Sequence, residues 1–190
     1  YRHISYKALH DFVYKGYLRK QVSEEHAQLA ADVLLKADLR GSDSHGVARL
    51  SGYVRLMEKN GINPDPKFKI IAESPTTATL DADSGVGLVS APYAMKLAIE
   101  KARTYGSGWV AISNSNHFGI AGYHASMALE HDMIGFAMTN ASPLVAPTFS
   151  TERLLGTNPI CVAIPAGEEP AFVADLATTT AANGKLDIFS

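Results

Sequence analysis

Three side chains with useful chemistry are spaced four residues apart in the stretch RGSDSHGVARLSGY. They are His45, Arg49 and Tyr53, and Ser44 directly precedes the histidine. An imidazole exchanges protons near neutral pH, a guanidinium holds a carboxylate through two parallel hydrogen bonds, and a phenol orients an oxygen atom. On one helix, each step of four residues drifts by only about 40°, so the three side chains would share a face. The stretch predicts either a site for a small carboxylic acid or an exposed polar face at a capped helix entrance.

A second candidate site is the stretch SNSNHFGIAGYHA, which follows an expected buried strand and leads into an expected helix. Ligands of α/β proteins bind at the ends of strands, and the backbones of Gly119 and Gly122 can approach a ligand closely. His117 is then the candidate acid/base residue. The alternative is that the asparagines and glycines make a turn in which His117 is a capping group.

The stretch TLDADSGVGLVS lies between an expected strand and an expected helix, and Gly85 and Gly87 give it a GxG pattern. Ser90 stands where a dinucleotide-binding loop has its third glycine, and no acidic residue follows at the expected distance of about 20 positions. A plain turn is the alternative interpretation. If the protein uses a dinucleotide, we expect a fold other than the usual Rossmann fold to hold it.

Three histidines recur every seven residues, at His117, His124 and His131. Two helical turns separate neighbouring histidines by roughly 10 Å, which is too far for one metal ion. The sequence also contains no His-Glu-x-x-His and no Cys-x-x-Cys motif. We therefore expect no metal site.

The composition is that of an ordinary folded protein, with 46% hydrophobic residues among 190 and a formal net charge of −2. The 17 lysines and arginines do not cluster, which argues against a nucleic-acid partner and favours small molecules or other protein chains. Cys161 is the lone cysteine, so we expect it to be a small buried residue in a protein of the reducing cytoplasm. No apolar run approaches the ~20 residues of a membrane helix, so we expect no membrane partner.

The spacing of apolar residues divides the chain into a helical first part and a second part in which strands alternate with helices. Apolar residues recur at helical spacing through the first 60 residues, with Ser5 and Ser23 as N-caps and a third helix from about residue 45 to residue 60. The period then changes to two, and strands alternate with helices, one of which has Pro92 at its first position. The predicted order is three helices, two strands, a helix, a strand, a helix and three strands. This order predicts an α/β fold of the mixed α+β kind, not a purely doubly wound sheet.

The change of period near residue 62 predicts two domains. We expect an N-terminal helical segment over residues 1–62 and a mixed α/β domain over residues 63–190. The final stretch, TTTAANGKLDIFS, opens a new segment without a cap or a tail-like composition, which indicates a chain cut short on its C-terminal side.

Five stretches together resemble the type 2 malate/L-lactate dehydrogenase family, and the similarity covers nearly the whole chain. They are LRGSDSHGVARLSGY, DADSGVG, SNSNHFGIAGYHA, GFAMTNASPLVAPTFSTERLLGTNPICVAIPA and VADLATTTAANGKL, in family order. The family also contains ureidoglycolate and sulfolactate dehydrogenases and reductases of 2,3-diketogulonate and of cyclic imino acids. The resemblance implies hydride transfer between NADH or NADPH and a 2-oxo or 2-hydroxy acid, on a non-Rossmann fold with a mixed-sheet cofactor domain. It also implies a homodimer with active sites near the subunit interface.

The resemblance gives roles to the candidate residues. His117 resembles the acid/base residue that protonates the substrate oxygen, and His45 resembles a second functional histidine, which is the proton donor in some members. The residues that resemble substrate contacts are Ser44, Arg49 and Tyr53. The residues that resemble cofactor contacts are Asn140, Asn158, Asp175, Leu176 and Ala177. The sequence leaves open the choice between NAD and NADP and the choice between the two histidines as proton donor.

Malate or lactate is the expected substrate. One alternative within the family is the reduction of a cyclic imino acid or of a sugar-derived 2-oxo acid. An alternative of another class follows from the length, because family members are considerably longer than this chain. On that interpretation the chain is a truncated, non-catalytic module that oligomerises or binds a partner through its helical face.

Overall fold

A computed structural model describes residues 4–179 of the chain. Contacts between Cα atoms divide it into two compact units, one that ends at Ile120 and one that begins at Ala121. The predicted domain boundary at residues 62–63 falls inside the first unit, at the change from helices to strands, and it stays a prediction.

The first unit begins with two capped helices, α1 (Tyr6–Leu18) and α2 (Glu24–Leu39). The hydroxyl groups of Ser5 and Ser23 accept the backbone N–H three residues further on, which satisfies one of the free donors at each helix start. Both caps are therefore confirmed. The two helices pack side by side, and α2 contributes most of the buried side chains of this region.

The third helix is shorter than predicted. The structure has α3 over Leu50–Glu58, preceded by two single 3₁₀ turns, Asp43–His45 and Val47–Arg49. Gly46 separates these turns with an extended backbone at φ −90° and ψ −144°, which interrupts the ladder of helical hydrogen bonds. The predicted helix start near residue 45 is therefore wrong, and positions 45, 49 and 53 do not share one helix face.

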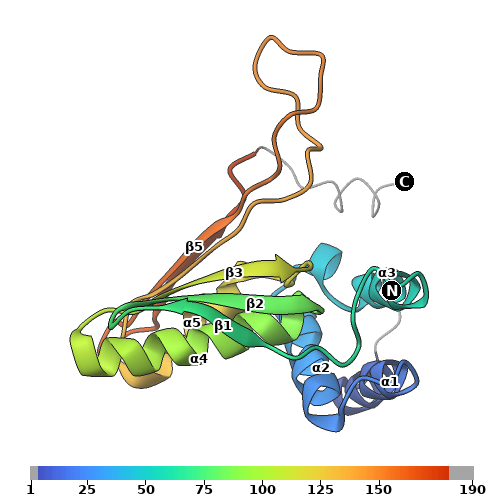
Figure 1. Ribbon diagram of the computed structural model, residues 1–190, viewed down its shortest axis with the longest axis horizontal. Helices are drawn as coiled ribbons and strands as arrows, with labels where there is room; N and C mark the ends of the chain where they lie inside the picture. Colours follow the sequence, from blue (N-terminus) through green and yellow to red (C-terminus); the bar gives the residue numbers. More distant parts are fainter. Residues whose placement is uncertain (1–3, 180–190) are drawn as a thin grey trace. The chain divides into compact units, whose positions relative to one another are not determined.

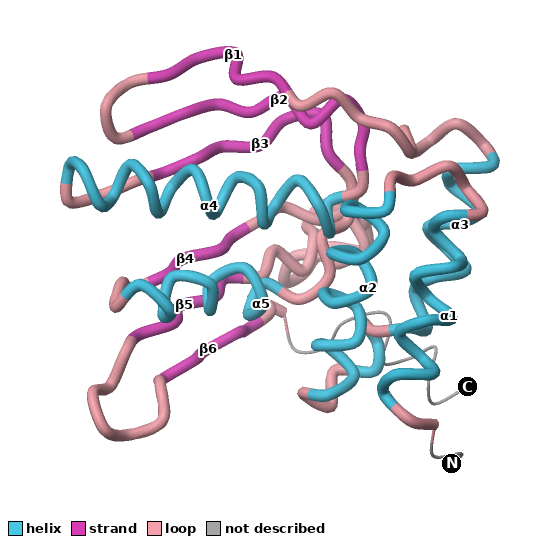
Figure 2. Tube along the Cα trace, turned by 90° about the horizontal axis from the view of Figure 1, so that it is seen from below, coloured by secondary structure: helices cyan, strands magenta, loops and turns pink. Residues whose placement is uncertain are grey.

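A three-stranded sheet follows in the same unit, formed by β1 (Lys69–Glu73), β2 (Thr77–Gly85) and β3 (Trp109–Ser115). β1 pairs with β2 in antiparallel fashion, and β2 pairs with β3 in parallel fashion. The crossover between the parallel strands is the long helix α4 (Gly87–Tyr105), which runs along the sheet in Figures 1 and 2. The prediction that Pro92 occupies the first position of this helix is wrong, because the helix already starts five residues earlier and Pro92 lies inside it.

The second unit contains α5 (Ala121–Ser126), a 3₁₀ helix η3 (Met127–His131) and a three-stranded antiparallel sheet. Its strands are β4 (Gly135–Met138), β5 (Ile160–Ile164) and β6 (Phe172–Leu176), in that order across the sheet. α5 lies beside this sheet in Figure 2 and contacts all three strands.

Small residues let α5 approach the second sheet. A Cβ at Gly135 of β4 would collide with the carbonyl oxygen of Ala125 in α5. Cys161 and Ala163 of β5 are fully buried, so the interpretation of Cys161 as a small buried residue on a strand is confirmed.

The order of helices and strands agrees with the prediction, and the mixed α/β class is confirmed. The first sheet contains a parallel and an antiparallel pair, and the second sheet is antiparallel, so neither is doubly wound. Within residues 4–179, no helix combines the length and the apolar composition that a membrane span requires.

Candidate active site

The loop that carries His45 is held by a carboxylate from α2. Asp38 Oδ2 accepts the backbone N–H of Val47 at 2.9 Å, and a Cβ at Gly46 would collide with the same carboxylate. Only glycine allows this approach. The pKa of Asp38 is raised, first by burial and further by the charge of Asp43, although the Val47 N–H opposes the shift.

Within this loop, hydrogen bonds join Ser44 both to His45 and to Arg49. Ser44 is buried, and its hydroxyl lies 2.9 Å from His45 Nδ1. Arg49 is half-buried and donates from Nε to the Ser44 carbonyl oxygen at 2.6 Å. Because Nε is already bonded, the two terminal nitrogens of the guanidinium are the atoms left to hold a carboxylate.

The loop that carries His117 begins where β3 ends. Parallel pairing brings the ends of β2 and β3 to one edge of the sheet, and Asn116 joins them there by donating its amide to the carbonyl oxygens of Ser84 and Gly85 at 2.8 Å and 3.1 Å. A Cβ at Gly87, the first residue of α4, would collide with the carbonyl oxygen of Asn116. The start of α4 therefore packs directly on the backbone beside His117.

The two loops meet at the histidines. The rings of His45 and His117 stack with centroids 5.5 Å apart and planes inclined by 26°. Tyr53, from α3, places its hydroxyl oxygen 2.6 Å from His117 Nδ1. The structure thus brings together side chains that are up to 72 positions apart in the sequence, between residues 45 and 117.

Hydrogen bonds indicate the tautomer of His117. The backbone N–H of Gly119 donates to Nδ1 at 3.3 Å, so this nitrogen carries a lone pair, and the Tyr53 hydroxyl donates to the same atom. The hydrogen of the neutral ring is then on Nε2, the nitrogen that faces away from Tyr53. Nε2 is therefore the atom of His117 that can exchange a proton with a ligand.

Partial desolvation and nearby charges lower the pKa of His117, although part of this residue is exposed to solvent. Desolvation by the surrounding protein, together with the positive charges of His45 and Arg49, lowers its pKa to about 4. Burial also raises the pKa of Tyr53 above its usual range, so this phenol stays protonated and remains a hydrogen-bond donor. A bound carboxylate would oppose the effect of the two positive groups, and it would raise the pKa of His117.

Five of the sequence-predicted residues are thus gathered in the first unit. They are Ser44, His45, Arg49, Tyr53 and His117. All five stay candidates for holding or protonating a small acid. Tyr53 is nearly buried, and its hydroxyl oxygen lies within hydrogen-bond distance of His117 Nδ1. Their roles in a reaction stay predictions.

The predicted cofactor contacts lie in the second unit, at one end of its sheet. Met138 of β4 pairs with Ile160 of β5, which pairs with Leu176 of β6, so the residues that flank these positions share one edge. Asn140 and Ala177 follow strands that end there, and Asn158 precedes the strand that begins there.

Hydrogen bonds tie this edge together. Asn158 Oδ1 accepts the backbone N–H of Ala141 at 3.0 Å. Asp175 behaves differently, because its carboxylate accepts the N–H of Gly122 at the start of α5 at 2.6 Å. The edge offers side-chain amides and backbone groups, which are the donors and acceptors that polar parts of a dinucleotide require.

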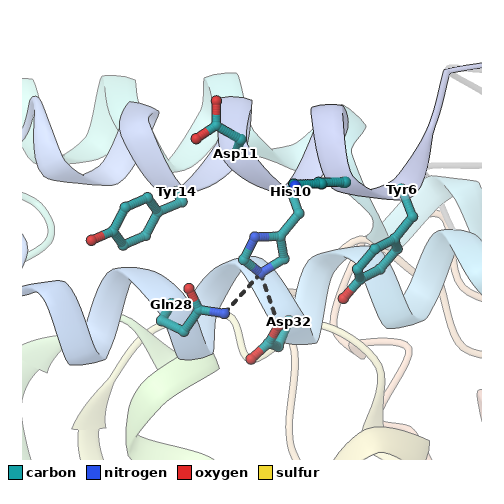
Figure 3. Close-up of a pocket in the computed structure, with 7 residues that line it drawn as sticks. Tyr6, His10, Asp11, Tyr14, Gln28 and Asp32 are labelled. Atoms are coloured by element: carbon teal, nitrogen blue, oxygen red, sulfur yellow. Dashed lines mark hydrogen bonds and ion pairs between the residues drawn. The ribbon is translucent and has the colours of Figure 1, made fainter.

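A groove of about 520 Å³ lies between α1 and α2, apart from the histidine pair. Its centre is His10, whose Nε2 lies 2.8 Å from Asp32 Oδ1 and 3.2 Å from the amide nitrogen of Gln28. Figure 3 shows Tyr6 and Tyr14 on either side of this histidine. The contacts join one helix to the other, so we interpret them as a structural link. Within residues 4–179, no group of three or more histidine, cysteine or acidic residues could hold a metal ion.

The residues that support the two loops were not predicted from the sequence. Nothing in the sequence distinguishes Asp38 or Asn116 from any surface polar residue, because their partners are distant or are backbone atoms. Gly87 did carry a signal. Glycine weakens a helix, and a glycine at a helix start indicates a close approach of another backbone.

Comparisons with known proteins identify the family of the chain. The family model described as malate/L-lactate dehydrogenase matches residues 4–190. The malate dehydrogenase of Pyrococcus abyssi is 52% identical over 181 residues, which are 95% of this chain and 50% of that protein. The solved malate dehydrogenase of Pyrococcus horikoshii OT3 superposes with a TM-score of 0.96 at 47% identity, over 98% of this chain and 53% of the other. A Δ1-piperideine-2-carboxylate reductase from Pseudomonas syringae pv. tomato superposes with a TM-score of 0.90 at 28% identity, over 99% and 57% of the two chains.

The fold, with its two three-stranded sheets, is thus that of a class of solved dehydrogenases. The chain belongs to the malate/L-lactate dehydrogenase family. It spans about half the length of the relatives that it matches.

Proposed function

We propose that the chain carries the substrate-binding residues of an NAD(P)-dependent 2-hydroxy acid dehydrogenase that acts on malate or lactate. The observation that carries the proposal is the convergence of His45, His117 and Arg49 in one unit. The 52% identity to a malate dehydrogenase supports the choice of substrate class.

Each residue of the cluster has a separate task in this proposal. The terminal nitrogens of Arg49 hold the carboxylate of the acid, and Ser44 keeps the guanidinium and His45 in place. During reduction, the imidazolium form of His117, which a bound carboxylate favours, gives the Nε2 proton to the substrate oxygen. This step leaves a neutral ring with its hydrogen on Nδ1, facing the Tyr53 oxygen, and during oxidation Nε2 takes the proton back. His45, stacked on His117, is the second candidate for this proton transfer.

The cofactor in the proposal is NAD or NADP. A bound nicotinamide supplies the hydride in reduction and receives it in oxidation. The residues that would hold the cofactor are those at the sheet edge of the second unit: Asn140, Asn158, Asp175, Leu176 and Ala177. The amide groups and backbone at this edge fit a polar ligand, whereas Asp175 has one oxygen committed to α5. The family resemblance further supports a homodimer.

A second candidate is the reduction of a cyclic imino acid. The TM-score of 0.90 to a Δ1-piperideine-2-carboxylate reductase supports this candidate at a lower identity of 28%. Such a substrate also carries a carboxylate, so Arg49 would keep its task. The proton of His117 would then go to a nitrogen in place of an oxygen.

A substrate and cofactor panel tests the proposal. The purified whole protein is assayed with oxaloacetate, pyruvate and piperideine-2-carboxylate, each with NADH and with NADPH. We expect oxaloacetate or pyruvate to give the highest kcat/KM. Activity with piperideine-2-carboxylate alone would favour the second candidate, and a lack of turnover together with no saturable change in nicotinamide fluorescence would support a non-catalytic module.

Arg49→Ala provides the matched test of the carboxylate clamp. Loss of a charge-assisted bidentate pair should raise KM for the acid by about tenfold or more and leave the affinity for NADH unchanged. Arg55→Ala is the control, because Arg55 is an exposed arginine at the other end of α3. An unchanged KM in Arg49→Ala would remove the clamp from the proposal.

A further inference from the structure

β2 contains an irregular bulge at its carboxyl end, at the edge of the sheet where the His117 loop begins. The pairing of β2 with β3 shifts between Asp81 and Gly85. Inside the bulge, Asp83 and Ser84 have φ angles of 50° and 55°, in the left-handed region that residues other than glycine rarely adopt. Bulges are common beside active sites, where they re-aim a side chain, so this one requires an explanation.

Side-chain hydrogen bonds hold the bulge in place. Asp81 Oδ1 accepts the backbone N–H of Asp83 at 2.9 Å and the amide of Asn114 at 3.0 Å. The Ser84 hydroxyl donates to Asn114 Oδ1 at 2.8 Å. On the other side, the Asn63 amide donates to Asp83 Oδ2 at 2.9 Å. The backbone carbonyl oxygens of the bulge therefore have fixed positions.

The side chain of Asn116 contacts two of these carbonyl oxygens. Its amide nitrogen lies 2.8 Å from the Ser84 oxygen and 3.1 Å from the Gly85 oxygen. A primary amide has two hydrogens on one nitrogen, so it can donate one to each carbonyl, which neither a hydroxyl nor a carboxylate can do. The backbone carbonyl of Asn116 meets the start of α4, where a Cβ at Gly87 would collide with it. Asn116 is therefore held through its side chain and through its backbone.

His117 directly follows Asn116, and its contacts depend on where the backbone places it. Its ring stacks on His45, and its Nδ1 lies 2.6 Å from the Tyr53 hydroxyl oxygen and accepts the Gly119 N–H. A backbone shift of about 1 Å is enough to break a hydrogen bond of this length, and a misplacement of that size can cost about 100-fold in turnover.

We propose that Asn116 is a positioning residue, whose amide binds the two carbonyl oxygens presented by the β2 bulge and so fixes the backbone that places His117 against Tyr53 and His45. The bulge then has a task, because it holds the acceptors for this amide. The effect of Asn116 on turnover rests on the proposed function. Its effect on the place of the imidazole does not.

The direct test is Asn116→Ala in the whole protein, with ¹⁵N-labelled histidine followed by NMR over pH. Nitrogen chemical shifts report which ring nitrogen carries the proton. A displaced ring loses the Tyr53 donor at Nδ1, so the share of the Nδ1–H tautomer should increase. It also leaves the desolvated place beside His45 and Arg49, so the pKa of His117 should rise from about 4 by about half a unit or more.

Asn63→Ala is the matched control, because it also removes an asparagine amide from the bulge but leaves both bonds of Asn116 in place. Both variants should lower the midpoint of urea unfolding, whereas only Asn116→Ala should change the tautomer and the pKa of His117. Equal changes at His117 in the two variants would reduce Asn116 to a general contributor to stability and overturn the proposal.

Asn116→Asp separates the donors from the shape of the side chain. Aspartate has the size of asparagine but cannot donate to the two carbonyl oxygens. At pH 8, where the imidazole is neutral, its His117 nitrogen shifts should depart from wild type as those of Asn116→Ala do. This variant also serves if Asn116→Ala does not fold. Wild-type His117 shifts in Asn116→Asp would overturn the proposal.

Kinetics separate this proposal from the proposed function. In an active protein, Asn116→Ala should lower kcat by about tenfold or more and leave KM for the acid within about twofold, because Ser44 and Arg49 belong to the other loop. A protein without dehydrogenase activity that still shows the NMR change would retain the positioning role and lose the proposed function. An unchanged kcat with an unchanged NMR signature would remove Asn116 from the site.

Discussion

At the residue scale, a hydroxyl group lies within hydrogen-bond distance of Nδ1 in each of the two histidines. Ser44 provides this hydroxyl for His45, and Tyr53 provides it for His117. In His117, Nε2 is then the nitrogen that can exchange a proton with a ligand. The pair is asymmetric in its support, because a buried phenol holds His117 and a small hydroxyl holds His45. This asymmetry favours His117 as the histidine in which neighbouring groups determine which ring nitrogen carries the proton.

Removing the His117 imidazole tests this assignment. His117→Ala should lower kcat/KM by about 10²–10⁴, the usual cost of losing a general acid or base. NADH binding, followed by nicotinamide fluorescence, should change little. His131→Ala, at an exposed histidine outside the cluster, should keep wild-type turnover. If His117→Ala retained turnover within a few-fold, His45 would be the proton donor.

The lowered pKa of His117 has a consequence for stability. Between pH 4 and the ordinary pKa of 6.5, the unfolded chain binds a proton that the folded chain does not. The free energy of unfolding therefore rises with pH across this window, and the contribution is lost on acidification. Water reaches the exposed part of His117, and screening reduces the contribution to about 1 kcal/mol or less.

Urea unfolding at pH 4.5 and pH 7.5 measures this effect. His117→Gln should lose less stability on acidification than wild type, because glutamine takes up no proton in either state. His131→Gln controls for the removal of an exposed histidine. Equal pH dependence in wild type and His117→Gln would mean that the folded-state pKa of His117 is ordinary.

At the element scale, the position of the His117 loop depends on how closely α4 approaches it. Gly87→Ala would place a Cβ against the carbonyl oxygen of Asn116, so the helix start or the loop must move. We expect a loss of about 1–3 kcal/mol in unfolding free energy and weaker ring stacking of the histidines. Gly52→Ala on α3 is the matched control, because no atom lies within 4 Å of its Cβ position. That control should be neutral or stabilising by up to ~1 kcal/mol.

The sequence predicted the elements better than their ends. Apolar periodicity and serine caps were sufficient for the order of helices and strands, since these signals are local. The start of α3 was missed because Gly46 is extended only where a distant carboxylate, Asp38, holds the next N–H. Pro92 was misplaced because its burial within α4 depends on packing that the local sequence does not express.

The candidate site could be predicted only in part. Spacing grouped residues 45, 49 and 53 for a reason that proved wrong, since 3₁₀ turns and not one helix face bring them together. The position of His117 after an expected strand made it a candidate, and the family resemblance gave it a role. Neither the spacing nor the resemblance indicated that Tyr53 would bond to it across 64 positions. Long-range pairing of this kind follows from the parallel sheet and its crossover, which fix where the two loops meet.

At the scale of the whole molecule, the two kinds of candidate residue fall in different units. The substrate candidates lie before Ile120, and the cofactor candidates lie after it. A fragment that ends at Ile120 should therefore fold and keep the His117 tautomer, because the contacts of that histidine are all internal to it.

Expression of the fragment that ends at Ile120 tests whether the substrate and cofactor candidates belong to separate units. Circular dichroism and histidine ¹⁵N shifts should match those of the same residues in the whole protein. Titration with NADH should give no saturable fluorescence change, because the proposed cofactor contacts are missing. An unfolded fragment would mean that the first unit depends on the second for its stability.

The hydrogen bond from the Val47 amide to Asp38 also makes the opening rate of the His45 loop measurable. An amide hydrogen held by a half-buried carboxylate exchanges with deuterated solvent only when that bond opens. The exchange rate of this single amide therefore times the opening of the loop, without substrate, cofactor or turnover. Mass spectrometry or NMR of Val47 would measure how often the peptide that carries His45 leaves its place.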